Sequence, residues 1–228
     1  MLLSSLPSSP LSPCLIHGAP DEIRIASQWK PTADGRPLGL AAFACTTYIM
    51  SAYNAGWGPD FIWIGAALFY GGLGQLLAGM WQFKRNCTFT ATAFSTYGCF
   101  WMSLAVFKIL EISKLLPKET MAEFVEAQGW FVLAFFLFNT YVLAASLMMC
   151  VVEVLVFFLL HLTLLCLFVG HLKGQPPGLT ASWTMAGGYF GLFTAIAAWY
   201  YSFACLLNSL IKKQVIPVGP PLIKFNVE

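Results

Sequence analysis

Four side chains on one predicted helix have a spacing that suggests chemistry: Phe43, Thr47, Ser51 and Asn54. They follow each other at steps of four, four and three, so a helix brings them to one face. Hydroxyl and amide groups donate and accept hydrogen bonds, and an aromatic ring at the head of the stripe can narrow a path. The rest of this segment is apolar enough for lipid. We therefore expect the stripe to line a path for a small polar solute.

The composition indicates an integral membrane protein. Hydrophobic residues make up 58% of the chain and charged residues only 10%, whereas soluble domains are roughly one quarter charged. A helix needs about 20 predominantly apolar residues to cross a bilayer. Six runs approach or exceed this length, at about 38–54, 61–82, 89–110, 130–149, 152–172 and 180–210. The sequence thus predicts an all-α integral membrane fold, a six-transmembrane-helix bundle.

The predicted spans leave room for one domain with two tails. Residues 1–36 are rich in Ser and Pro and are expected to be a disordered tail, residues 37–211 form the transmembrane transport domain, and residues 212–228 form a short C-terminal tail. With six spans both tails lie on one side. Lys and Arg are more frequent there (Arg24, Lys30, Arg36, Lys84, Arg85, Lys212, Lys213 and Lys224) than on the other side (Lys108, Lys114, Lys118 and Lys173). The positive-inside bias then predicts that both tails are cytoplasmic.

Several functional classes find no support in the sequence. The net charge of +2 and the lack of a basic cluster argue against nucleic acid. His17, His161 and His171 lack the spacing of a metal motif, and no nucleophile pairs with a base. The seven scattered cysteines are expected to pack as small apolar residues. We expect no enzyme activity, no metal and no cofactor.

Polar residues inside the spans are the remaining candidates, because such groups usually face a cavity or another helix. They are Thr47, Asn54, Gln75, Tyr97, Asn139 and His161. Five of them also have a structural explanation. Asn54 could end its helix before Gly56, Gln75 could contact another helix from a ridge of small residues, and Tyr97 could simply pack against its neighbours. Asn139 and His161 could each form a hydrogen bond to another helix. The one charge in the apolar stretch 130–172, Glu153, is expected in or near the turn between the fourth and fifth spans.

Ordered motifs in five regions resemble the acetate uptake transporter family, the fungal and bacterial acetate and succinate permeases. Pro37-Leu-Gly-Leu40 is similar to the second half of its Asn-Pro-Ala-Pro-Leu-Gly-Leu signature, and Thr46-Thr47 and Tyr53-Asn54-Ala-Gly56 follow. Further matches are Phe69-Tyr-Gly-Gly-Leu-Gly-Gln75 with Ala78-Gly-Met-Trp81, Thr88 to Gly98 with Phe100-Trp101, Gly129-Trp130, Leu162-Thr163 near Gly170-His171, and Ile216-Pro-Val-Gly219. The resemblance covers about residues 34–219.

The resemblance implies a six-helix bundle with one conduit per subunit, assembled as a homohexamer in a lipid bilayer. It implies small monocarboxylates as substrates, chiefly acetate, with succinate in some members. By position, the apolar constriction falls at Phe43, Tyr97 and Leu162. The polar groups of the substrate pathway fall at Thr46, Thr47, Asn54, Gln75 and Thr92.

The chain departs from the family pattern at several positions. Asp34-Gly35-Arg36 replaces Asn-Pro-Ala, Gln82 replaces Glu, and Asn86-Cys87 replaces Gly-Asn. Ser146-Leu147-Met148 lacks a basic residue expected after the fourth span, and Glu153 adds a negative charge nearby. Loss of a positive group and gain of a negative one disfavour an anion at that mouth of the conduit.

The expected function is a transporter or channel for acetate, and possible proton coupling is left open. A carboxylic acid with a pKa near 4 is only about one part in a thousand protonated at pH 7, so a conduit must accept the anion or bring a proton. With Glu153 placed near a turn, no buried carboxyl is expected to serve as a relay. The alternatives are a conduit for ammonia or another neutral solute, and a non-transporting membrane sensor or scaffold. The expected location is the plasma membrane.

Overall fold

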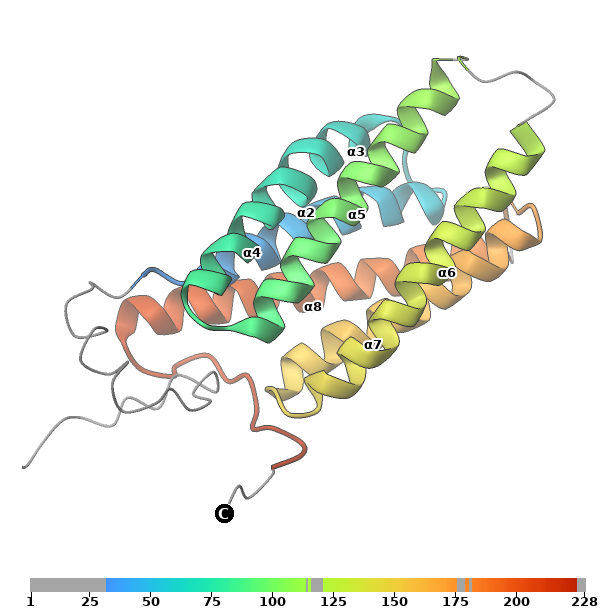
Figure 1. The fold of residues 1–228 in the computed structure, drawn as a ribbon. Coiled ribbons are helices and arrows are strands. Elements are labelled where there is room, and N and C mark those ends of the chain that lie inside the picture. Colours follow the sequence, from blue (N-terminus) through green and yellow to red (C-terminus); the bar gives the residue numbers. More distant parts are fainter. Residues whose placement is uncertain (1–31, 114, 116–120, 176–178, 181, 225–228) are drawn as a thin grey trace, which may run out of the picture.

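The structure, a computed structural model, is a bundle of helices and describes residues 32–113, 115, 121–175, 179–180 and 182–224 (Figure 1). Its elements are α2 (Arg36–Asn54), α3 (Ile62–Gly65), η1 (Ala66–Gly74), α4 (Gln75–Lys84), α5 (Thr88–Ile112), α6 (Met121–Ser146), α7 (Val151–Leu172) and α8 (Trp183–Ile211). The elements α3, η1 and α4 follow one another without a break and form one rod. The predicted all-α fold is confirmed.

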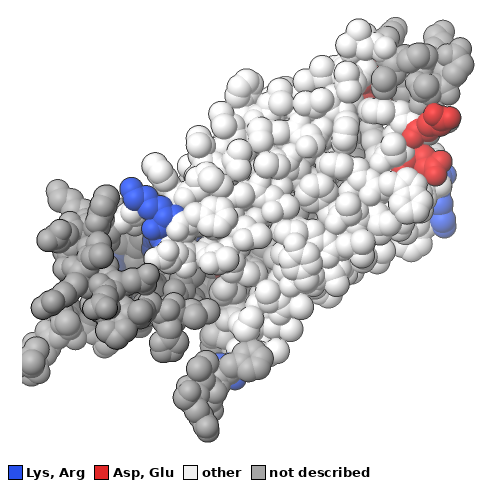
Figure 2. Space-filling model, viewed as in Figure 1, with Lys and Arg blue, Asp and Glu red and all other residues white. Residues whose placement is uncertain are grey.

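Within the part of the chain that the structure describes, five rods are long and apolar enough to cross a membrane: Ile62–Lys84, Thr88–Ile112, Glu123–Ser146, Val151–Leu172 and Trp183–Ile211. The remaining helix, α2, has 19 residues but carries Arg36, Thr46, Thr47 and Asn54, which make it less apolar. It packs along α8 and η1. In the space-filling view, charged side chains gather at the two ends and a broad uncharged surface separates them (Figure 2). This distribution fits a protein whose middle faces hydrocarbon.

One predicted boundary differs from the structure. The sequence predicts that the fourth span begins at about residue 130, whereas α6 already begins at Met121. Its first turns are amphipathic, with Glu123 and Glu126 exposed, and Glu123 in the first turn is favourable near the positive end of the helix dipole. The amphipathic segment is therefore continuous with the span.

Small residues let the helices approach closely, as the sequence predicts. A Cβ atom on Gly71 of η1 would collide with the side chain of Thr46 on α2, and one on Gly191 of α8 would collide with Ser51. The ridge that contains Gly71 and Gln75 is buried, although part of it adopts π-helical geometry, which is rare and often occurs at functional sites. The glycines thus fix α2 between η1 and α8.

The two described ends of the chain meet at the same end of the bundle (Figure 1). Ser202 on α8 donates a hydrogen bond to the carbonyl of Pro37 at the start of α2 (2.7 Å). The segment after α8 folds back over the α6–α7 turn, where the amide of Leu222 donates to the carbonyl of Leu147 (3.1 Å). We call this the tail end, and the opposite end, where α2 ends and α8 begins, the loop end.

Candidate functional site: two cavities and an apolar barrier

A cavity of about 350 Å³ lies at the loop end of the bundle. Parts of α2, α3, α5, α6 and α7 enclose it, and several of its groups are polar or charged: Tyr53, Asn54, Lys108, Glu111, Gln128, His171 and Gln175. Asn54 is the last residue of α2 and is 4% exposed. This predicted pathway residue therefore both ends its helix and lines the larger cavity, so the two alternatives for Asn54 do not exclude each other.

A second cavity, of about 30 Å³, lies toward the tail end. Its lining combines apolar side chains with a few polar groups: Leu40, Phe43, Gln75, Thr90, Ala93, Phe94, Tyr97, Glu153, Val156, Phe157, Leu160 and Tyr201. A cavity of this size has room for about two water molecules. None of the residues that the structure describes lines both cavities.

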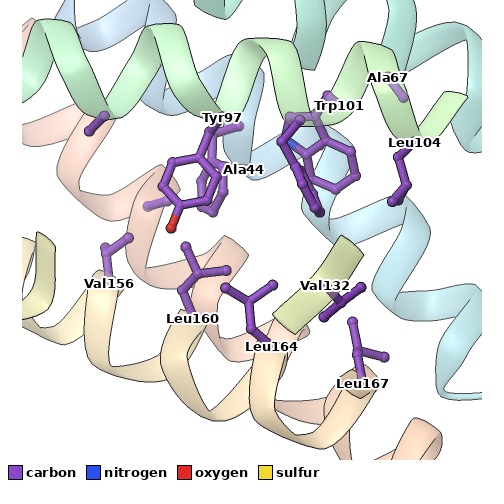
Figure 3. Packing of buried hydrophobic residues seen from close by; sticks show 14 of the residues in the cluster. Ala44, Ala67, Tyr97, Trp101, Leu104, Val132, Val156, Leu160, Leu164 and Leu167 are labelled. Atoms are coloured by element: carbon purple, nitrogen blue, oxygen red, sulfur yellow. The ribbon is translucent and has the colours of Figure 1, made fainter. Parts of the chain in front are cut away.

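Buried apolar side chains pack together in the middle of the bundle (Figure 3), and members of this cluster line both cavities. Phe43, Tyr97 and Leu160 line the tail-end cavity, whereas Phe100 and Leu104 line the loop-end cavity. All five belong to one hydrophobic cluster that also contains Trp101 and Leu164. We call this cluster the apolar barrier. Narrow apolar constrictions of this kind exclude water and large solutes.

The structure brings two of the three predicted constriction residues together. The ring centroids of Phe43 and Tyr97 are 6.0 Å apart, and both side chains are buried. Leu162 on α7 is half-buried and lines neither cavity. A helix turns about 100° per residue, so Leu160 and Leu164 share a face that Leu162 does not. Leu160 is the α7 leucine that lines the tail-end cavity beside Phe43 and Tyr97.

Tyr97 is held in place by a polar network across three helices. Its hydroxyl donates to Oδ1 of Asn139 on α6 (2.7 Å), and Nδ2 of Asn139 donates to the carbonyl of Phe157 on α7 (3.1 Å). Nδ2 of Asn139 also lies 3.4 Å from Nδ1 of His161. The structural alternative for Asn139 and His161, helix-to-helix hydrogen bonds, is therefore confirmed. The ring of Tyr97 faces the barrier while its hydroxyl points toward α7 (Figure 3).

The predicted polar pathway residues differ in their surroundings. Among the described residues, Oγ1 of Thr47 and Oε1 of Gln75 are buried without a hydrogen-bond partner, and Gln75 lines the tail-end cavity. Such groups are costly unless a solute or water satisfies them. By contrast, Oγ1 of Thr46 donates to the carbonyl of Ala66 (3.4 Å) and joins α2 to η1. Thr92 is half-buried and lines neither cavity.

Three further residues line the tail-end cavity or lie in the apolar barrier but were not selected from the sequence. Thr90 and Leu160 line the tail-end cavity, and Nε1 of Trp101 is buried in the barrier without a partner among the described residues. The sequence of α5 does contain a pattern that could have identified Thr90 and Trp101. Thr90, Tyr97 and Trp101 are separated by seven and four positions and so share a helix face. No sequence pattern distinguishes Leu160, because leucines surround it in the sequence.

Most departures from the family pattern converge at the tail end. Oδ1 of Asp34 accepts a hydrogen bond from Nε2 of Gln82 (2.8 Å), and Asp34 pairs with Arg36 (2.6 Å) and Arg85 (3.4 Å). Burial alone would raise the pKa of Asp34, but the hydrogen bond and charge of Arg36, with the charge of Arg85, hold this pKa below its ordinary value. Two departures from the family pattern, Asp34 and Gln82, are thus hydrogen-bonded to each other within a local ion cluster.

The other departures lie nearby. Cys87 is buried at the N-cap of α5, and Met148 is exposed in the α6–α7 turn. Glu153 lies in the first turn of α7, close to that turn as the sequence predicts. Its side chain, however, points inward: the residue is 8% exposed, lines the tail-end cavity and accepts a hydrogen bond from the hydroxyl of Tyr201 (3.0 Å).

A second ion cluster lies at the loop end. Nζ of Lys108 on α5 is 2.6 Å from Asp60, which precedes α3, and 3.2 Å from Glu111. Burial would raise the pKa of Asp60, but its hydrogen bonds with Lys108, Phe61 and Trp63 hold it below its ordinary value. Lys108 also lines the larger cavity, so this cavity contains a positive group whose charge is largely compensated.

Comparisons with known proteins agree with this arrangement. The sequence matches the GPR1/FUN34/yaaH family over residues 21–220. It is 39% identical over 200 residues to acetate permease A of Emericella nidulans, covering 82% of this chain and 66% of that protein. It is 31% identical over 190 residues to the succinate-acetate/proton symporter SatP of Escherichia coli K12, covering 82% of this chain and 95% of that protein.

The fold is shared as well. A solved structure of the bacterial acetate channel SatP superposes with a TM-score of 0.74 and 29% sequence identity, covering 82% of this chain and 99% of that one. The chain spans just under two thirds of the length of the Emericella nidulans permease. The family match covers most of the chain, including every helix that lines the two cavities, and the chain therefore belongs to the GPR1/FUN34/yaaH family.

Proposed function

We propose that this protein conducts small monocarboxylates, chiefly acetate and in addition succinate, across a membrane through the interior of each subunit. The observation that carries the proposal is the pair of cavities at opposite ends of the bundle, separated by a barrier that contains Phe43 and Tyr97. The relatives named for acetate and succinate support the choice of substrate.

The proposed path runs from the loop-end cavity past Asn54, through the barrier, to Gln75 in the tail-end cavity. The hydroxyl of Thr47 and the indole N–H of Trp101 have no partner among the described residues and can donate to a carboxylate as it passes, which replaces part of its hydration. Gln75 serves the anion through its amide NH2, because its Oε1 is an acceptor. Phe43, Tyr97 and an α7 leucine set the width. In this assignment Leu160 takes the position that the family resemblance gives to Leu162.

The proposed assembly is a homohexamer of six-span subunits in the plasma membrane. We count α2 as the sixth span, because the start of α2 and the segment after α8 lie at the same end of the bundle, and an even number of crossings is needed for that. Lys84, the last residue of α4, and Arg85, which follows it, lie at the tail end, and the positive-inside bias supports a cytoplasmic position for both tails.

The decisive experiment is uptake of labelled acetate, succinate and methylammonium by proteoliposomes that contain the purified protein. We expect acetate uptake well above that of empty vesicles, inhibited by unlabelled acetate. Methylammonium flux without competition by acetate would instead indicate a conduit for ammonia or a neutral solute. Folded protein that shows no flux of any of the three would overturn the transport proposal and favour a sensor or scaffold.

A further inference from the structure

Glu153 is a buried carboxyl group that the proposed path does not use. The sequence places it near a turn, but its side chain lines the tail-end cavity together with Gln75 and Tyr201. In the proposed path, a solute that enters or leaves the barrier at the tail end passes this cavity. A buried carboxylate is costly unless it is paired, and its one hydrogen bond among the described residues comes from the hydroxyl of Tyr201.

The charged groups around Glu153 come from several elements. Arg36 from α2 and Asp34 before it act on Glu153 electrostatically, and α8 contributes Tyr201 and Cys205. Cys150 lies just before α7, and Tyr97 from α5 lines the same cavity. Of these groups, only Arg36 offers a positive charge, and it is already paired with Asp34.

The net charge of the cluster formed by Asp34, Arg36, Arg85 and Glu153 depends on one proton. Asp34 and an ionised Glu153 provide two negative charges, and Arg36 and Arg85 provide two positive charges, so the formal charge is zero. Protonation of Glu153 leaves the group with one net positive charge. A carboxylate in the tail-end cavity is then attracted by the cluster, whereas an ionised Glu153 repels it directly.

We propose that Glu153 is the pH-responsive selectivity residue of the conduit: protonated, it admits carboxylate anions to the tail-end cavity, and ionised, it excludes them. This inference rests on the proposed function of acetate conduction. The space of about 30 Å³ beside Glu153 has room for the water that brings the proton. The hydroxyl of Tyr201 donates to the carboxyl group of Glu153, and both side chains line the tail-end cavity.

The test compares acetate uptake by native protein and Glu153→Gln in proteoliposomes with equal pH inside and outside, from about pH 5 to pH 8, a range that lies above the ordinary Glu pKa of about 4.3. Equal pH makes the orientation of the protein irrelevant, and uptake by empty vesicles is subtracted at each pH. Glu123→Gln, an exposed change at the loop end, is the matched control.

We expect native uptake to rise as the pH falls, and Glu153→Gln to take up acetate almost independently of pH. At the alkaline end Glu153→Gln should exceed native protein by roughly three- to tenfold, the scale of one unit charge acting over several ångström of partly hydrated protein. Glu123→Gln should follow the native profile. Glu153→Asp, which keeps a titratable group, should retain the pH dependence.

The possible failures are distinguishable. If native protein shows no uptake above empty vesicles, the proposed function itself fails. If native protein transports acetate but Glu153→Gln has the same pH profile, the role of Glu153 is overturned alone. Should Glu153→Gln not fold, Tyr201→Phe serves instead: without its donor the ionised carboxylate is less favourable, so uptake should persist to higher pH, and an unchanged profile would equally contradict the inference.

Discussion

At the scale of single residues, burial and pairing distinguish the polar groups that the sequence treats alike. Thr46 and Thr47 are neighbours on α2 and both are buried. Thr46 is paired with the carbonyl of Ala66, whereas Oγ1 of Thr47 has no partner among the described residues. An unpaired buried hydroxyl costs free energy that a passing solute can recover. Thr46 therefore joins α2 to η1, whereas the hydroxyl of Thr47, which lines neither cavity, remains able to bind a solute in the proposed path.

The residues of the apolar barrier predict which substitutions let larger substrates pass. Truncation of Phe43 or Leu160 to Ala should open the tail-end side of the barrier and admit acids larger than acetate, because both side chains line that cavity. Leu162→Ala should leave the range of substrates unchanged, since Leu162 lines neither cavity. Competition of a series of carboxylic acids against labelled acetate measures this. A relaxed range in Leu162→Ala alone would restore Leu162 as the constriction residue.

The tail-end ion cluster predicts a pH-dependent contribution to stability. The pKa of Asp34 is lowered in the folded protein, so its stabilisation is present above the ordinary value of 3.8 and is lost as the pH falls through the lowered pKa. Asp34→Asn should therefore reduce the free energy of unfolding at neutral pH, by about 2 kcal/mol. Thermal unfolding in detergent at several pH values measures the difference between the two proteins.

That difference should shrink as the pH falls below 3.8 and Asp34 becomes protonated in both states. Glu123→Gln, exposed and far from the cluster, is a suitable control and should unfold like native protein at every pH. A constant difference between native protein and Asp34→Asn at all pH values would show that the carboxylate charge is not what stabilises this end.

At the scale of elements, the position of α2 depends on glycine contacts with its neighbours. η1 approaches α2 at Gly71 and Thr46, and α8 approaches it at Gly191 and Ser51. Because polar residues make α2 less apolar than the other rods, lipid alone stabilises it less. Close van der Waals packing therefore has a larger share in holding α2 in place.

Gly71→Ala should destabilise the bundle, because the added Cβ would meet Thr46 at a distance that real side chains do not adopt. Overpacking of this kind costs about 1–3 kcal/mol. Gly65→Ala is the matched control, since a Cβ there has nothing within 4 Å. Thermal unfolding in detergent should show a lower midpoint for Gly71→Ala only. Equal midpoints for both variants would mean that α2 and η1 can separate at little cost.

At the scale of the whole molecule, the two ends of the bundle have different characters. The tail end contains the compensated cluster of Asp34, Arg36 and Arg85 and the narrow cavity with Glu153. The loop end contains the wide cavity with Lys108. A carboxylate entering at the loop end meets a wide polar space first and the narrow, charge-sensitive part last.

The six-span proposal predicts the sides on which introduced cysteines react. In a background without native cysteines, Thr32→Cys and Asn86→Cys should react with an impermeant reagent from one side of the membrane, and Gly58→Cys from the other. Thr32 precedes α2, Gly58 follows it, and Asn86 follows α4. Labelling of Thr32→Cys and Gly58→Cys from the same side would show that α2 does not cross the membrane.

Much of the fold could be predicted from the sequence, because a helix that crosses a bilayer must have about 20 predominantly apolar residues. Five of the six predicted runs correspond to rods that are apolar and long enough to cross a bilayer. The start of α6 was placed too late, because amphipathic turns such as those around Glu123 look like a loop when only apolar length is counted. The family motifs, which need no geometry, identified the family that the comparisons confirm.

The sequence by itself determined the helical membrane fold, the family and the buried polar stripe of α2, since these depend on composition, periodicity and local order. Only the tertiary structure decided which partner each buried polar group has. It separated Leu160 from Leu162, joined Asp34 to Gln82 across 48 positions, and turned Glu153 into the tail-end cavity. The physical reason is that the helices packed around a side chain determine where it points and which group it pairs with. The sequence of its own segment does not specify those neighbouring helices.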